Sequence, residues 1–452
     1  MKLNARNFVI DNLVVIIFLS FTVLGFILSG GVPLFFFLNE LIDRVFRNSF
    51  LVLSLIIPVI AGLGLNFGIV VGAMAGQAAI IFVRYHEMGG FGALMLCFLL
   101  SFPLALLFGY LTGKLYNRVR GQEMIASLIV GFFAQGIYNF VFLYAVGGII
   151  PVTQGNPIII DKIGVRVSVD LGAHEDGGLK YALDFIYRVP PIYLLLAGAI
   201  TFLVFIFIRK HIYRRKKVHD TTSRLRFWIY FAVSIIAIIF SIAAIFAGSS
   251  FAGCDCMRGR FPCYINSLHN SPLIIWLSEL MRLRQAPLVT VLVIAALCFF
   301  MHILMKTKLG QDFRSVGQSQ HIAEVSGINV DRTRIIATIF STVLAAWGMI
   351  IFMQNFGTLA TYDSHRNIGI FSVAALLVGG ASTSRASLKN AIIGVLLFNS
   401  MTIISPELGR AVFGSPEAGE FFRSFMVYGV IGLALGIYVW KQHKAAKDKN
   451  TL

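Results

Sequence analysis

Apolar runs of about 20 residues recur along the chain from Leu13 to Trp440, separated by short polar stretches. A helix of that length crosses the roughly 30 Å hydrocarbon core of a bilayer. The pattern predicts an all-α fold, a polytopic transmembrane helical bundle of about 10–12 spans. Two pairs, 50–65 with 67–83 and 367–380 with 390–404, are short, and either could instead form a re-entrant hairpin. The candidate spans lie near residues 13–29, 50–65, 67–83, 91–112, 124–147, 192–208, 227–247, 289–305, 335–355, 367–380, 390–404 and 424–440.

The first apolar run has one feature of a signal peptide, because Lys2 and Arg6 precede it. A cleavage site of small residues followed by a polar mature sequence is missing. Instead the chain continues through Gly30, Gly31 and Pro33 into further apolar sequence. We therefore expect this run to be retained as a membrane anchor.

Composition excludes a water-soluble domain of this length, since 57% of the 452 residues are hydrophobic and 13% are charged, with a mean hydropathy of +0.81. The formal charge of +17 could indicate nucleic acid, but basic residues beside membrane spans have a simpler explanation in topology. If the amino terminus is cytoplasmic, the inward segments hold 24 of the 38 Lys and Arg and 7 of the 21 acidic residues, which is the whole excess. We predict cytoplasmic termini (N-in and C-in), a location in the cell (inner) membrane, the lipid bilayer as surroundings, and no nucleic-acid partner.

Glycines at four-residue spacing mark one segment, because Gly64, Gly68, Gly72 and Gly76 would form one smooth stripe on a helix. Such a stripe allows another helix to approach closely. The alternative is an unwound segment that lines a solute path, since glycine lowers the cost of interrupting a helix.

The candidate spans contain neutral polar groups rather than charges. No Asp or Glu lies clearly in mid-span, and Glu123, Arg84 and Arg366 lie near span ends. Proton- or sodium-coupled carriers usually need a membrane-embedded charge, so the pattern favours another energy source. Amides suit a neutral, polyhydroxylated or heterocyclic solute, although hydrogen bonds between helices would explain them equally. The tentative substrate pathway comprises Asn66, Gln77, Gln135, Asn139, Gln354 and Asn399.

A polar segment of about thirty residues, 306–334, separates two spans. A short helix is predicted over Gln318–Ser326, ended by Gly327. Apolar residues recur at Ile322, Val325 and Ile328, a periodicity that a plain solvated loop would not need. A short helix held between two membrane helices suits a permease that docks on a separate motor protein.

The same segment carries a resemblance. The run LGQDFRSVGQSQHIAEVSGINV (309–330) resembles the cytoplasmic coupling loop of ABC permeases that import simple sugars, nucleosides and branched-chain amino acids. RGQEMIASLIVGFFA (120–134) resembles the nucleoside branch, whose helix begins Asn-Glu-Val-Ile, and GIFSVAALLVGGAST (369–383) resembles a stretch ending in a Gly-Gly pair. The coupling-loop matches are Gly310, Val316, Gly317, Ala323, Ser326, Gly327, Ile328, Asn329 and Val330.

The resemblance implies a single permease domain over 1–452, with 306–334 as its coupling segment and 191–288 as an insertion that adds a helix pair. It also implies three protein partners: a cytosolic ATP-binding subunit, a second permease subunit in a homo- or heterodimer, and an extracytoplasmic solute-binding protein. The sequence has no phosphate-binding GxxxxGK[ST] motif, so ATP is expected to be used by a partner and no cofactor to be bound here. The residues expected to couple to the ATPase are Gly317, Ala323, Glu324, Ser326, Gly327 and Asn329.

On this interpretation the chain is a translocation subunit and not an enzyme. It moves a nucleoside, a related heterocycle such as a vitamin, or a simple sugar into the cytoplasm by alternating access. The alternative is an ion-independent secondary carrier or channel for a small neutral solute. A membrane enzyme is disfavoured, because His86 and His365 have no obvious nucleophile or metal partners in the sequence.

Three of the five cysteines cluster in a predicted outward loop, at Cys254, Cys256 and Cys263. A disulfide between Cys263 and one of the others is the favoured use in an oxidising compartment. A metal site with His269 is the alternative, but the spacing matches no strong zinc pattern, so no metal is expected.

Overall fold

The computed structural model describes residues 12–28, 32–153, 155–160, 163–172, 177–215, 221–252, 272–281, 283–383 and 385–450. The described chain is mostly helical, with four short strands. It divides into two compact units. Unit 1 comprises Met1–Val32, Asp43–Ile186 and Val289–Leu452, and unit 2 comprises Pro33–Ile42 and Tyr187–Leu288.

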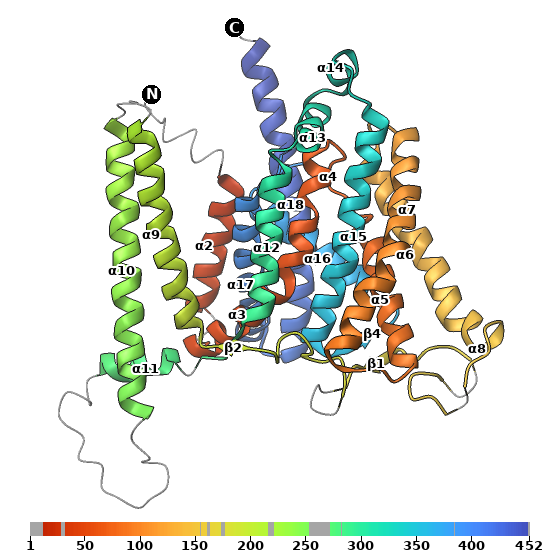
Figure 1. Cartoon of the computed structure of the whole chain (residues 1–452), viewed down its shortest axis with the longest axis horizontal. Coiled ribbons are helices and arrows are strands. Elements are labelled where there is room, and N and C mark those ends of the chain that lie inside the picture. The colour runs from red at the N-terminus through yellow and green to blue at the C-terminus, as the bar shows by residue number, and fades with distance from the viewer. Residues whose placement is uncertain are drawn as a thin grey trace, which may run out of the picture. The chain divides into compact units, whose positions relative to one another are not determined.

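Unit 1 is a bundle of helices of very different lengths. Helices α13 and α14 lie at one end of the unit, and strands β1 (Ser168–Asp170) and β4 (Thr358–Ala360) lie at the other (Figure 1). The two strands pair antiparallel, with Val169 opposite Leu359. The helices are α2 (Leu13–Leu28), α3 (Leu34–Ser54, of which the residues from Asp43 onward belong to this unit), α4 (Ile56–Ile60), α5 (Ile69–Tyr85), α6 (Gly90–Arg118), α7 (Glu123–Phe140), the π-helical turn η1 (Val141–Ala145), α8 (Val146–Gly148), α12 (Leu288–Leu304), α13 (Lys308–Gln318), α14 (Gln320–Val325), α15 (Val330–Phe356), α16 (Ser364–Val378), α17 (Leu388–Phe413) and α18 (Pro416–Asn450).

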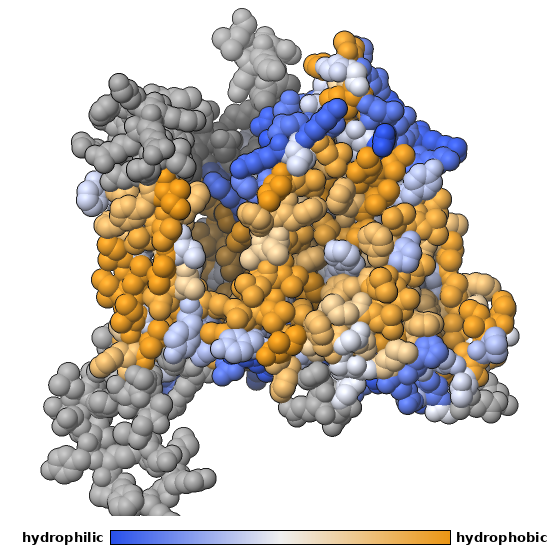
Figure 2. All heavy atoms as spheres, viewed as in Figure 1, coloured by the Kyte–Doolittle hydropathy of each residue, from blue (hydrophilic) through white to orange (hydrophobic). Residues whose placement is uncertain are grey.

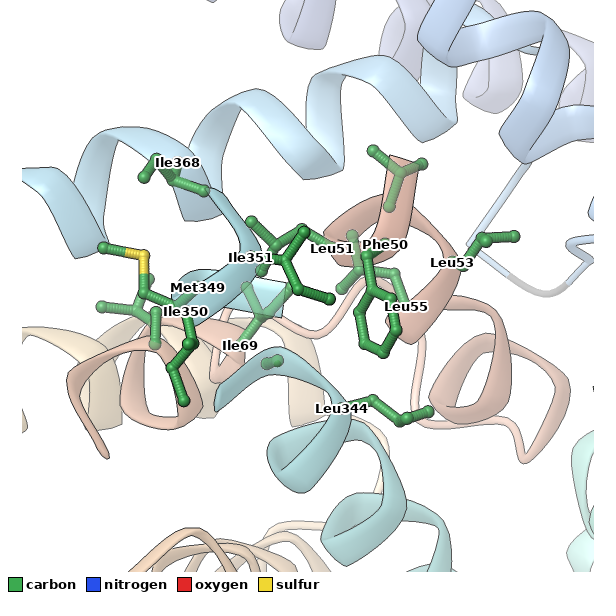
Figure 3. Packing of buried hydrophobic residues seen from close by; sticks show 14 of the residues in the cluster. Phe50, Leu51, Leu53, Leu55, Ile69, Leu344, Met349, Ile350, Ile351 and Ile368 are labelled. Atoms are coloured by element: carbon green, nitrogen blue, oxygen red, sulfur yellow. The ribbon is translucent and has the colours of Figure 1, made fainter. Parts of the chain in front are cut away.

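The core of unit 1 forms where α3, α5, α15 and α16 meet. Leu51, Ile69, Met349 and Ile350 are almost completely buried there, and Ile368 of α16 packs into the same cluster (Figure 3). Helices α15 and α17 are the most buried of the long apolar helices of the described chain, since 67% of the apolar part of each is buried inside the protein. Burial of this apolar surface fixes how the helices that carry polar side chains are arranged.

The glycine stripe is used in two ways. A Cβ atom placed on Gly76 would lie 2.5 Å from the carbonyl oxygen of Ala346, and one on Gly72 would collide with the Thr342 carbonyl oxygen. These two glycines let α5 approach the backbone of α15 closely. Gly64 and Gly68 precede α5, and Gly64 has a φ of +72° in the turns before it. The packing interpretation thus holds for Gly72 and Gly76. Gly64 lies in non-helical chain, and its role in lining a solute path stays a prediction.

Substituting Gly76 by leucine should therefore destabilise the bundle by about 1–3 kcal/mol, because the side chain has no room against α15. The measurement is thermal unfolding of the purified protein in detergent. Gly136→Leu is the matched control, since a Cβ atom at this helical position meets no atom within 4 Å. Equal destabilisation by both variants would contradict the close contact between α5 and α15.

The chain is a multi-pass membrane protein. Six helices of the described chain are long and apolar enough to cross a bilayer, and α12 with α13 would make a seventh span if counted together across their 75° bend. A hydrophobic band covers the middle of unit 1, with hydrophilic residues above and below it (Figure 2). Each predicted span except 50–65 falls on a helix, which confirms an all-α polytopic bundle. The six helices are α6, α7 through α8, residues 191–208, residues 227–247, α15 and α17.

The predicted span at 50–65 is wrong. Residues 50–54 complete α3, Leu55 interrupts the helix, α4 covers 56–60, and turns follow up to Gly68. The hydropathy pattern does not identify α3 as a helix, because the middle of α3 carries Glu40, Asp43, Arg44 and Arg47.

Unit 2 contains a pair of long helices, α9 (Pro191–Arg215) and α10 (Thr221–Ala252), with the shorter α11 (Pro272–Met281). Strands β2 (Arg188–Val189) and β3 (Ala286–Pro287) pair antiparallel within it. A small core includes Ile192, Ala244 and Leu277. The range predicted as an insertion, 191–288, falls in this unit, and its status as an addition to a family core stays a prediction. Cys254, Cys256 and Cys263 lie outside the described residues.

Candidate functional site

A buried polar cluster lies between α5, α7 and α16 of unit 1. It comprises Gln77, Gln135, Tyr138, Asn139 and His365, and is called the His365 cluster below. The His365 ring is completely buried, with Nδ1 2.5 Å from Oε1 of Gln77 and Nε2 2.6 Å from Oε1 of Gln135. Nε2 of Gln135 donates to the Tyr362 carbonyl oxygen at 2.6 Å and to Oδ1 of Asn139 at 3.4 Å. The Tyr138 ring lies 4.8 Å from the imidazole, centroid to centroid.

The proton count of the His365 cluster constrains its glutamines. A neutral imidazole carries one N–H, so it cannot donate to two amide oxygens at once. Either the ring is doubly protonated or one amide presents its NH₂ group instead. Turning the Gln77 amide satisfies the geometry, because Nε2 of Gln77 has no hydrogen-bond partner among the described residues. The buried Tyr138 hydroxyl likewise has none there, so the cluster keeps unused hydrogen-bonding capacity.

The other predicted pathway residues lie elsewhere and have structural hydrogen bonds. Oδ1 of Asn66 accepts from the Tyr116 hydroxyl at 2.8 Å and from the Gly68 amide at 2.9 Å. Oε1 of Gln354 accepts from the Leu183 amide at 3.3 Å, and Oδ1 of Asn399 accepts from Nδ2 of Asn48 at 2.7 Å. The structure therefore brings together Gln77, Gln135 and Asn139, and separates Asn66, Gln354 and Asn399 from them.

The segment between α12 and α15 folds into two short helices, α13 and α14, at one end of unit 1 (Figure 1). Each begins with a capping hydroxyl, from Thr307 and Ser319. The helix predicted over Gln318–Ser326 is confirmed as α14, Gln320–Val325, whereas α13 was not predicted. Gly327 has a φ of +79° and ends the turn after α14, as expected.

Helix α14 is braced on one side and exposed on the other. Ala323 is buried against Val316 of α13 and Val330 of α15. Ile322 and Val325 are 65% and 77% exposed. Figure 2 shows a hydrophobic tip above the hydrophilic surface at the end of unit 1 that carries α14. Of the predicted apolar periodicity, only Ile328 faces the protein.

The predicted coupling residues build this segment. A Cβ atom on Gly317 would collide with the Ile60 carbonyl oxygen, so α13 packs directly on the end of α4. The Ser326 hydroxyl donates to the Ile322 carbonyl oxygen at 2.8 Å. Oδ1 of Asn329 accepts from the Arg332 amide at 2.9 Å and caps α15. Their contact with an ATPase stays a prediction.

Ion pairs connect this segment to the turn between α6 and α7. Nη1 of Arg120 lies 3.1 Å from Oε1 of Glu324, and Nη2 lies 2.6 Å from Oδ1 of Asp331. The hydrogen bond with Asp331, more than that with Glu324, raises the pKa of the Arg120 guanidinium above its usual range. These groups line a shallow cleft of about 350 Å³ with Gly327, Ile328, Asn329 and Val330.

A second, buried ion pair lies nearby. Nη2 of Arg334, whose side chain is 0% exposed, lies 2.5 Å from Oε1 of Glu123 and donates to the Tyr116 carbonyl oxygen at 3.1 Å. Sequence reasoning placed Glu123 at a helix start and named Gln77 and Gln135, but it missed Arg334, Arg120, Asp331 and the contact of His365 with the two glutamines. A basic residue at the start of an apolar run is the only signal for Arg334.

The family comparison covers most of the chain. The model of the family described as "Branched-chain amino acid transport system / permease component" matches residues 44–431. No solved structure matches this chain.

Curated relatives match over shorter stretches. The chain is 30% identical to the nucleoside ABC transporter permease protein NupB of Lactococcus lactis subsp. cremoris over 111 residues, and 27% identical to NupC of the same organism over 150 residues. It is 28% identical to the xylose transport system permease protein XylH of Haemophilus influenzae over 151 residues. These alignments cover 24%, 33% and 33% of this chain, and 30%, 45% and 38% of the respective relatives. The chain thus spans less than half the length of each.

Proposed function

The chain belongs to the permease family of branched-chain amino acid transport systems, and from this premise we propose that it is the translocation subunit of an ATP-driven importer. A neutral polar solute, with nucleosides as the first candidate, would pass through unit 1 by alternating access. ATP hydrolysis would take place on a separate subunit.

One observation carries this proposal. Helix α14 presents Ile322 and Val325 to solvent while Ala323 fastens it between α13 and α15. An exposed apolar pair on a braced element is suited to burial in a groove of a partner protein. A carrier without partner subunits has no need of an exposed apolar docking site. A permease driven by an ATPase needs a rigid contact that transmits the movement of the ATPase.

The proposal extends to the assembly and its orientation. The end of unit 1 that carries α14 would face the cytoplasm, in keeping with the basic residues of 306–334. The cytosolic ATP-binding subunit would bind there, a second permease subunit would complete the pathway, and an extracytoplasmic binding protein would deliver the solute at the other end. The cell (inner) membrane is the proposed location.

The His365 cluster supports the choice of solute. Its side chains are two glutamines, an asparagine, a phenol and an imidazole, and they combine amide donors and acceptors with aromatic surface. Side-chain amides can form hydrogen bonds with the donors and acceptors on the edge of a nucleobase, and aromatic rings can stack on its face. Two curated relatives are named for nucleosides and one for xylose, in line with this chemistry.

The test is uptake by vesicles that hold this chain with its ATPase and binding protein. We expect ATP-dependent uptake of a labelled nucleoside, in preference to xylose and leucine. His365→Ala should lower that uptake roughly tenfold, because two hydrogen bonds of the His365 cluster are lost. His302→Ala, at an exposed histidine of α12, is the control. Uptake without ATP would favour the carrier alternative, and preferential uptake of leucine would refute the choice of solute.

A further inference from the structure

Arg120 connects the turn between α6 and α7 with two carboxylates that lie 204 and 211 residues further along the chain. Its guanidinium forms ion pairs with both Glu324 of α14 and Asp331 at the start of α15. Its backbone belongs to the turn between α6 and α7. The side chain of Asn117, at the end of α6, also donates to the Asp331 carbonyl oxygen at 2.9 Å. A movement of α14 therefore acts on this turn through Arg120.

The turn leads directly into the helix that carries most of the His365 cluster. Helix α7 begins at Glu123, and Gln135, Tyr138 and Asn139 follow on the same helix. The pair of Glu123 with Arg334 fastens the start of α7 to α15. Because this pair anchors the first residue of α7, a displacement of the turn would tilt α7 about Glu123 and so move the His365 cluster.

The setting of Arg120 indicates contacts that can form and break. Its two ion pairs are 40–56% exposed and line the cleft beside α14. Exposed ion pairs contribute little to the free energy of unfolding. A stabilising role therefore does not explain why the Arg120 guanidinium bridges two carboxylates. The buried pair of Glu123 with Arg334 has that structural role instead.

We propose that Arg120 is a positioning residue that couples α14 to the turn before α7 through its ion pair with Glu324, while Asp331 at the start of α15 holds the same guanidinium in place. The inference rests on the proposed function. When the ATPase moves α14, the link from Glu324 to Arg120 pulls the turn, and α7 shifts the solute-contacting side chains.

The test compares solute transported per ATP hydrolysed in reconstituted vesicles. Arg120→Gln and Glu324→Gln should each lower this ratio at least threefold while the ATPase still co-purifies with the chain. The double variant should resemble the single variants, because both break the same link. Arg118→Gln removes a charge from the same end of α6 and should leave the ratio unchanged.

The outcomes separate this inference from the proposed function. If no ATPase co-purifies with the unmodified chain, the proposed function fails. If the ATPase binds and Arg120→Gln transports with the unmodified ratio, the coupling role is refuted. Additive losses in the double variant, or loss of the ATPase from Arg120→Gln, would also refute it, because Arg120 would then act independently of Glu324 or belong to the docking surface.

Discussion

Replacing Arg334 with alanine is expected to lower the free energy of unfolding by about 3–5 kcal/mol, because Glu123 would keep a buried charge without its partner. The Arg334 side chain is 0% exposed and that of Glu123 is 9% exposed. The measurement is equilibrium unfolding in mixed detergent micelles.

Two controls separate this cost from general damage at the same end of the protein. Arg120→Ala removes an arginine whose ion pairs are exposed, and should cost no more than about 1 kcal/mol. The double variant Glu123→Gln with Arg334→Met leaves no buried charge and should recover much of the loss. If Arg334→Ala and Arg120→Ala were equally mild, the Glu123–Arg334 pair would not have the structural role assigned here.

Aspartates at Ile322 and Val325 are expected to abolish transport by removing the ATPase. An apolar pair buried in the centre of an interface contributes most of its binding energy, and a carboxylate there would be desolvated without a partner. We expect binding to weaken at least about 100-fold, roughly 3 kcal/mol. Thermal unfolding should be unchanged, since both side chains are exposed in this chain. Co-purification of the ATPase and ATP-dependent uptake are the two measurements.

A matched variant shows whether position matters. Val167 is 62% exposed and precedes β1, which lies at the opposite end of unit 1 from α14 (Figure 1). Val167→Asp should leave ATPase binding unchanged. Retention of the ATPase by the Ile322→Asp, Val325→Asp variant would mean that α14 is not the docking surface.

Hydropathy predicted most of the helices, because membrane helices need long apolar stretches whatever their partners. It failed at α3, whose polar residues are accommodated by neighbours distant in sequence. Nη1 of Arg44 donates to the Thr402 hydroxyl at 3.4 Å, and Asn48 bonds Asn399. No local sequence pattern indicates such distant partners. From the sequence, α3 is therefore too polar to be predicted as a helix of the bundle.

Residue type alone identified part of the His365 cluster. Amides within apolar runs drew attention to Gln77, Gln135 and Asn139, but equally to Asn66, whose hydrogen bonds hold a turn. His365 was weighed only as a catalytic residue and set aside, because a single histidine has no spacing that reveals partners on other helices. Which amides meet depends on how α5, α7 and α16 pack, and that is settled by the apolar core.

The coupling segment shows the same division between local and distant information. A short apolar pattern and a glycine were enough to predict α14 and its end. The ion pair between Arg120 and Glu324 joins residues 204 positions apart, so no local pattern indicates it. Contacts of this kind become visible only once α6 and α15 lie side by side.

The most direct measurement is photo-crosslinking from α14 in native membranes, with a photoreactive amino acid placed at Ile322 or Val325 and at Val167 as the control position. The account predicts that both α14 positions crosslink to an ATP-binding subunit and that the control position does not. Absence of an ATP-binding subunit from the α14 products, together with solute uptake that continues without ATP, would contradict it.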